Sequence, residues 1–132
     1  MLRQTQPGGP PPTLLLGAGA DPQQAARARA EGADLIDVRG ATPGALAAIR
    51  ASLPAGVLWT GTGADPLDAD RLVGEPEGRV TAAAVIATAA VCTWLGAPVV
   101  RSRHTRAVRR AIDMTASIAG RRPPSRTVRG LA

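Results

Sequence analysis

The chain contains no lysine, asparagine, phenylalanine or tyrosine, and it has one cysteine and one histidine among its 132 residues. The lack of lysine excludes Schiff-base lysine chemistry and a P-loop lysine. The lack of asparagine excludes that side chain as a ligand for a metal or phosphate. A single cysteine, Cys92, excludes an internal disulfide framework and cysteine-based zinc sites, and one histidine cannot form a zinc site alone. We interpret Cys92 as a small hydrophobic residue of the core.

Long apolar runs are also missing. The apolar stretch 80–95 is shorter than the roughly 20 residues that a bilayer-spanning helix needs, and it is rich in alanine and threonine. Residues 1–7 lack the charged region and apolar run of a secretory signal peptide. We therefore expect a cytoplasmic protein without membrane contact.

The charge is unevenly distributed. All sixteen basic residues are arginines: seven accompany nine acids in the first 100 residues, and nine accompany one acid in the last 32. A strongly basic C-terminal segment of this kind can bind nucleic acid. No aromatic residues interleave with these arginines and no known nucleic-acid-reading motif is present, so the sequence does not favour a nucleic-acid partner.

One pattern recurs three times, at a spacing of about 21–23 residues. A short apolar run is followed by Gly-Ala, then by Asp or Thr, then by Pro. Asp and Thr are good helix N-caps and proline fits the first helical position, so each repeat predicts a strand, a glycine turn and a capped helix. The expected caps are Asp21, Thr42 and Asp65, and the helices that follow are expected at 23–31, 44–53 and 67–73.

The stretch 79–118 completes the predicted fold. It reads as an apolar helix to residue 95, a Gly96-Ala97 break, a strand at 98–104 and an amphipathic helix at 105–119. Repeated strand-helix units predict an α/β fold with a parallel sheet, with about four strands and five helices. We expect this single domain to occupy residues 13–120, after a disordered Pro/Gly-rich lead at 1–12 and before a basic, extended tail at 121–132.

The strand at 98–104 ends in Arg101, Arg103 and His104. In parallel α/β folds, ligands bind at the C-terminal ends of strands, where helix N-termini also present free N–H groups to anions. Alternation places Arg101 and Arg103 on the same side of the strand. We therefore predict an anion pocket in which Arg101 is a bidentate clamp, Arg103 a second cation and His104 a donor. The arginines of the last helix are interpreted instead as a solvated face, with Arg109 paired to Asp113.

The segment Glu31-Gly-Ala-Asp-Leu-Ile-Asp37-Val-Arg-Gly40 resembles the second strand of dihydropteroate synthase. The family's strand-exit loop is shortened here to Gly40-Ala-Thr-Pro-Gly44. The resemblance returns at 79–84, at Leu95-Gly-Ala-Pro-Val-Val-Arg-Ser-Arg-His104 and in the ending 113–132, which looks like the tails of actinobacterial members.

This resemblance implies a TIM (β/α)₈ barrel enzyme of folate biosynthesis, a transferase that joins a pterin pyrophosphate to p-aminobenzoate, usually with Mg²⁺. It implies that Arg101 matches the family's phosphate-binding arginine, Arg103 stands where the family has His, and His104 where it has Asp. Thr42 would match a loop threonine near the pyrophosphate, and Asp37 the acid of the second strand. The resemblance thus implies that Thr42 and Asp37 bind substrate together with Arg101, Arg103 and His104.

Three departures from the family pattern stand out. The first-strand motif with its metal-linked Asn is replaced by Leu16-Gly-Ala-Gly19. The third strand lacks the Asp that holds the pterin, and the segment that supplies a further Asp and a Lys is absent.

By the resemblance, the remaining strands form a contiguous arc, because the last barrel strand lies beside the first. Half a barrel has two edge strands with unpaired backbone groups and an uncovered inner face, so we expect a homodimer or a heteromer with a related barrel protein.

Two functions remain open. The first is that of a shortened dihydropteroate-synthase-like protein that keeps a pocket for pyrophosphate or a pterin phosphate, with full catalysis doubtful. Alternatively, it is a noncatalytic partner subunit that completes a barrel by association.

Overall fold

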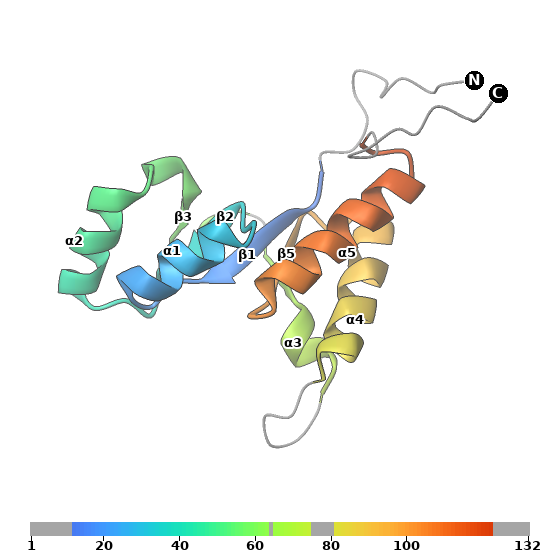
Figure 1. Cartoon of the computed structure of the whole chain (residues 1–132), viewed down its shortest axis with the longest axis horizontal. Helices are drawn as coiled ribbons and strands as arrows, with labels where there is room; N and C mark the ends of the chain where they lie inside the picture. The colour runs from blue at the N-terminus through green and yellow to red at the C-terminus, as the bar shows by residue number, and fades with distance from the viewer. Residues whose placement is uncertain (1–11, 64, 75–80, 123–132) are drawn as a thin grey trace.

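The computed structural model describes residues 12–63, 65–74 and 81–122. Within them five parallel strands form one sheet in the order β3-β2-β1-β5-β4 (Figure 1). The strands are β1 (Leu14–Ala18), β2 (Leu35–Asp37), β3 (Leu58–Trp59), β4 (Leu67–Asp68) and β5 (Val99–Arg101). The helices are α1 (Pro22–Ala30), α2 (Pro43–Ser52), α3 (Ala69–Leu72), α4 (Ala82–Trp94) and α5 (Thr105–Ile118), with a 3₁₀ turn, η1, at Ala55–Val57.

The predicted fold class is confirmed: parallel β/α repeats form an arc that resembles part of a barrel, with five helices among the described residues. The last strand lies beside the first, as the resemblance implied, with Leu14 opposite Val99 and Leu16 opposite Arg101. The sheet has five strands instead of about four.

Two of the three predicted helix caps form as expected. The Asp21 side chain accepts a hydrogen bond from the Gln24 N–H at 2.8 Å, and the Thr42 hydroxyl accepts one from the Ala45 N–H at 3.2 Å. Proline occupies the first turn of both helices.

The third repeat differs. Leu67 and Asp68, which we expected to lie in a helix, instead pair with β5 as a short edge strand. The helix begins at Ala69, and its N-cap is Asp68 in place of Asp65. The physical reason is tertiary: parallel pairing with the buried β5 gives the backbone of this segment hydrogen-bond partners that the local Asp-Pro signal does not anticipate.

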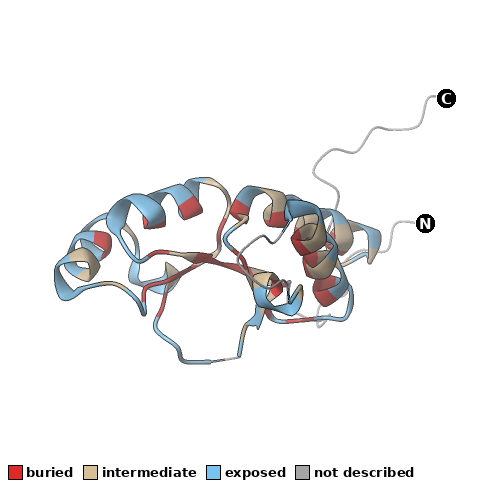
Figure 2. Ribbon diagram, turned by 90° about the horizontal axis from the view of Figure 1, so that it is seen from below, coloured by how far each residue is buried: buried red, intermediate tan, exposed pale blue. Residues whose placement is uncertain are grey.

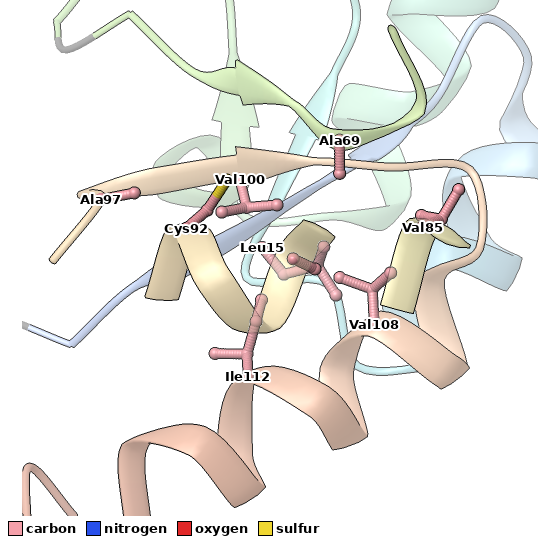
Figure 3. Packing of buried hydrophobic residues seen from close by; sticks show 9 residues of the cluster. Leu15, Ala69, Val85, Cys92, Ala97, Val100, Val108 and Ile112 are labelled. Atoms are coloured by element: carbon pink, nitrogen blue, oxygen red, sulfur yellow. The ribbon is translucent and has the colours of Figure 1, made fainter. Parts of the chain in front are cut away.

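Alternating side chains divide the sheet into two faces. On one face Leu15 and Val100 pack with Val108 and Ile112 of α5 in a cluster that also contains Cys92 (Figure 3). Cys92 is buried, as predicted, and burial raises the pKa of its thiol. The opposite face carries a small apolar layer of Leu16, Trp59 and Val99. The helix-covered face holds two clusters, one packed by α3, α4 and α5 and another, with Ala25, Ile36 and Ile49, packed by α1 and α2, whereas the second face is thinly covered.

The link between β3 and β4 crosses that second face. β3 and β4 are parallel and lie at opposite edges of the sheet. The link between them must therefore return from the C-terminal end of the sheet to its N-terminal end and also cross from one edge to the other. Figure 2 shows this segment on the opposite side of the sheet from most of the helices. The Trp59 Nε1–H donates to the Thr62 carbonyl at 3.0 Å, which fixes the start of the link. The open side of the arc is thus spanned by the chain's own connection.

The turn after β1 requires glycine for a steric reason. A Cβ on Gly19 would lie 2.2 Å from Cγ2 of Ile36, a fully buried side chain of β2. Because that methyl group is attached directly to the branched Cβ, it cannot swing away. Glycine at this position lets the β1–α1 turn lie against β2.

The predicted lead and tail fall largely outside the described residues. Residues 1–11 and 123–132 are not described, and the expected helix start at 79–80 also lies outside the described part. Arg121 is described, and its guanidinium donates to the Thr93 and Trp94 carbonyls at the end of α4. Arg122 pairs with Asp113 at 2.5 Å. Of the helices in the described ranges, none has the length and apolar character needed to cross a bilayer.

Candidate functional site

The C-terminal ends of three strands bring together an arginine and two aspartates. Arg101 ends β5, Asp37 ends β2 and Asp68 ends β4. The Arg101 Nε–H donates to Asp37 Oδ2 at 3.2 Å, and its Nη1–H donates to Asp68 Oδ2 at 3.1 Å. β1 lies between β5 and β2, and its last residue is Ala18, whose single methyl group leaves room for the guanidinium to reach across. Arg101 therefore links three strands.

Asp37 is shared by two guanidinium groups. Its Oδ1 accepts from the Arg39 backbone N–H at 3.1 Å and from Arg39 Nε at 3.0 Å, and its Oδ2 accepts from Arg39 Nη2 at 3.0 Å. Burial alone would raise the pKa of Asp37, but the hydrogen bonds and charge of Arg39, together with Arg101, outweigh burial and hold it below its usual value. The Arg39 guanidinium also lies 4.3 Å from the centre of the Trp59 ring, a cation–π contact.

Beside this cluster lies a cavity of about 540 Å³, which we call the mouth. Four arginines, three aspartates, one tryptophan, one glycine and one proline line it, three of them from the β3–β4 link (Gly61, Asp65 and Pro66): Arg39, Arg71, Arg101, Arg103, Asp65, Asp68, Asp70, Trp59, Gly61 and Pro66. Both arginines predicted at the strand exit, Arg101 and Arg103, line the mouth together. The strand expected at 98–104 is shorter, however: β5 ends at Arg101, so Arg103 lies beyond it and strand alternation does not set its position. A neighbouring hollow joins Arg101 to the first two glycine turns through Gly19 and Gly40.

The position of Arg103 is set by a carboxylate of α3. Asp70 Oδ1 accepts from the Ser102 hydroxyl at 2.7 Å, and Oδ2 accepts from the Arg103 N–H at 3.0 Å. Ser102 is buried, and its oxygen in turn accepts from the His104 N–H at 3.0 Å. This clasp ties the exit of β5 to α3, and the exposed Arg103 lines both the mouth and a second hollow formed with residues of α1.

The other predicted site residues lie away from the mouth. Thr42 caps α2 through its hydroxyl and is not among the residues that line the mouth. His104 occupies the N-cap position of α5, but its side chain makes no capping hydrogen bond, and it does not line the mouth either. The structure therefore brings together Asp37, Arg101 and Arg103 of the predicted set.

Sequence reasoning missed five residues of the site: Arg39, Trp59, Asp68, Asp70 and Arg71. A local signal existed for Arg39, since it follows the strand-end acid Asp37 by two residues and can fold back onto it. No local signal existed for the two aspartates of the β4–α3 segment, because their proximity to Arg101 depends on the pairing of β4 with β5.

The two carboxylates bound to Arg101, Asp68 in the mouth and Asp37 next to it, are a poor match for magnesium. Asp37 and Asp68 each form an ion pair with Arg101, so a guanidinium already occupies the oxygens that a hard cation would need. Over the described ranges, no group of three or more His, Cys, Asp or Glu side chains converges in a way that could hold a metal ion. Asp37 and Asp68 therefore do not fit a bound Mg²⁺.

Fold and site together define an arc of parallel β/α units with a mixed-charge mouth at its strand ends. Part of the chain is similar in sequence to curated proteins named inactive dihydropteroate synthase 2, from Mycobacterium bovis and from two strains of Mycobacterium tuberculosis. Each is 48% identical over 56 residues, which make up 42% of this chain and 16% of the relative's length. No family model matches the chain, and no solved structure matches it significantly. The similarity is therefore a partial relationship to dihydropteroate-synthase-like proteins.

Proposed function

We propose that the chain is a dihydropteroate-synthase-like protein that binds a phosphate-type anion, pyrophosphate or a pterin phosphate, and lacks synthase turnover. The observation that carries this proposal is the convergence of four arginines on a cavity of about 540 Å³ at the strand ends. Guanidinium groups bind phosphate oxygens in bidentate fashion, and the C-terminal edge of parallel strands is the usual place for ligands.

Loss of turnover is supported from two sides. The whole chain lacks lysine, and with it any lysine that could hold the pterin. The similar mycobacterial proteins are themselves named as inactive. In an assay of the purified protein for condensation of a pterin pyrophosphate with p-aminobenzoate, we expect no product. Measurable product would contradict this part of the proposal and would make the chain a transferase of that type.

Anion binding is tested by calorimetry with inorganic pyrophosphate. We expect Arg103→Gln to weaken binding about tenfold, because it removes one charge-assisted hydrogen-bonding group from the mouth. Arg106→Gln, an exposed arginine of α5 outside the lining, is the control for net charge and should stay within about twofold of the wild type. Arg103 is the better probe than Arg101, because removing Arg101 would also leave Asp37 and Asp68 without a partner. Equal losses for both variants, or no binding by the wild type, would contradict the proposal.

A second candidate function is that of a noncatalytic subunit. β3 and β4 are both edge strands, and large apolar side chains are exposed on α4 and α5, including Val91, Trp94 and Ile118. Both features favour association with a second copy or with a related barrel protein. The β3–β4 link crosses the open side of the arc, so closure of a ring by a second copy would have to displace it.

A further inference from the structure

The anion mouth contains a carboxylate that opposes its proposed function. Asp68 Oδ2 lies 3.1 Å from Nη1 of Arg101, the arginine that the resemblance assigns to phosphate binding. Both side chains are largely shielded from water, with exposed fractions of 24% for Arg101 and 20% for Asp68. An anion that approaches Arg101 must therefore share it with, or take it from, a fixed negative charge.

The charge balance of the cluster shows which carboxylate matters. Asp37 is already matched by Arg39, which binds it through its backbone N–H and two guanidinium nitrogens. The positive charge of Arg101 is then offset chiefly by Asp68. Asp70 does not contribute to this balance in the same way, because its oxygens bind the Ser102 hydroxyl and the Arg103 N–H.

We propose that Asp68 determines the anion affinity of the mouth by competing with the ligand for Arg101. This inference rests on the proposed function. It implies that Arg101 is a reserve cation, available to ligands charged enough to displace Asp68, whereas Arg103 and Arg71 meet the anion first. The mouth should then discriminate by ligand charge, favouring pyrophosphate over orthophosphate, because the electrostatic gain scales with the charge of the ligand.

The geometry offers a substitution that removes the charge and little else. Asp68 also caps α3, since its Oδ1 accepts from the Arg71 N–H at 3.2 Å. Asparagine and serine cap helices about as well as aspartate, so Asp68→Asn and Asp68→Ser keep this hydrogen bond and lose the carboxylate. Two variants guard against one of them failing to fold.

A matched control exists at the first repeat. Asp21 is likewise an N-cap, accepting from Gln24 N–H at 2.8 Å, but it does not line the mouth. Asp21→Asn changes the net charge by the same unit and keeps its cap in the same way. Any difference between the Asp21 and Asp68 variants therefore reports the position of the Asp68 carboxylate, in the mouth and beside Arg101.

The experiment is isothermal calorimetry of the wild type and these variants, with inorganic pyrophosphate and then orthophosphate as probes. We expect Asp68→Asn and Asp68→Ser to bind pyrophosphate about tenfold more tightly than the wild type, with a smaller gain for orthophosphate, and Asp21→Asn to change by no more than about twofold. Gains no larger than that of Asp21→Asn, in a wild type that binds, would overturn this inference alone. Binding by the Asp68 variants without binding by the wild type would support the inference and overturn the proposed function. Absence of binding throughout would overturn both.

Discussion

Asp37 shows how one carboxylate can organise a site without being free to bind a ligand. Arg39 and Arg101 both donate to it, and Arg39 in turn stacks on Trp59. The sequence predicted Asp37 and Arg101 as ligand-binding residues, and the structure places them in contact with each other. Of the predicted cations that line the mouth, Arg103 is the one without a carboxylate partner among the described ion pairs.

The lowered pKa of Asp37 makes its contribution to stability depend on pH. A carboxylate whose folded pKa lies below its unfolded value stabilises the fold above that unfolded value, about 3.8, and loses this contribution as the pH falls through the folded pKa. We expect Asp37→Asn to lower the free energy of unfolding at pH 7 by about 1–3 kcal/mol, because charge-assisted hydrogen bonds from two arginines are lost.

The measurement is urea denaturation of the wild type and Asp37→Asn between pH 7 and pH 3. The difference between the two proteins should be greatest at pH 7 and should shrink below pH 3.8. A gap that stays constant over this range would show that Asp37 acts through packing instead of charge. Asp21→Asn, outside the cluster, is the control.

The residues of the mouth that the sequence predicted come from the end of β5 and the turn that follows it. Arg101 and Arg103 could be placed because the end of a buried strand is a local property of the sequence. Alternation was the wrong reason for Arg103, which lies beyond β5 and is positioned by Asp70. Asp68, Asp70 and Arg71 could not, because they reach the mouth only through long-range pairing of Leu67 with Val100 and Asp68 with Arg101.

Among the elements, the turn between β1 and α1 is the most demanding sterically. We expect Gly19→Ala to destabilise the protein by about 1–3 kcal/mol, because the new methyl group would overlap the buried Ile36 side chain. Gly44→Ala in the first turn of α2 is the matched control: a Cβ there meets nothing within 4 Å, so the change should be neutral or stabilising by up to about 1 kcal/mol. Thermal or urea unfolding compares the two, and equal stability of both variants would contradict the steric argument.

Element prediction succeeded where the signal and the fold agree locally. The Asp-Pro and Thr-Pro caps of α1 and α2 were found because side chain and backbone satisfy each other within one turn. The same reasoning gave the wrong start for α3. Strand β4 occupies residues 67–68, where the helix was expected to begin, and Asp68 is the N-cap. A two-residue strand has almost no periodic signal, so its existence is decided by its neighbour in the sheet.

At the scale of the whole molecule, a single chain leaves a group of large apolar side chains exposed to solvent. Most of the exposed large apolar side chains in the described ranges lie on or beside α4 and α5: Val91, Trp94, Leu95, Met114 and Ile118. We expect light scattering at micromolar concentration to give a mass near twice the 13.4 kDa of one chain if the association is with a second copy.

A charge placed in this surface tests the association. Val91→Glu should shift the population towards the monomer, because burying an unpaired carboxylate in an interface is costly. Ala51→Glu, at an exposed position of α2, is the control and should leave the mass unchanged. A well-folded wild-type monomer at these concentrations would contradict self-association, and association with a related barrel protein would then be tested by mixing the two.

The pairing of β1 with β5 also sets the order in which the chain can fold. Leu14, Leu15 and Leu16 find their partners on one side in residues 99–101, more than eighty positions later. During translation the central strand must therefore wait, with one side unpaired, until residues 99–101 have left the ribosome. Contacts of such wide sequence separation slow folding, so a nascent chain that stalls before residue 99 presents a leucine-rich edge to chaperones or to other nascent chains.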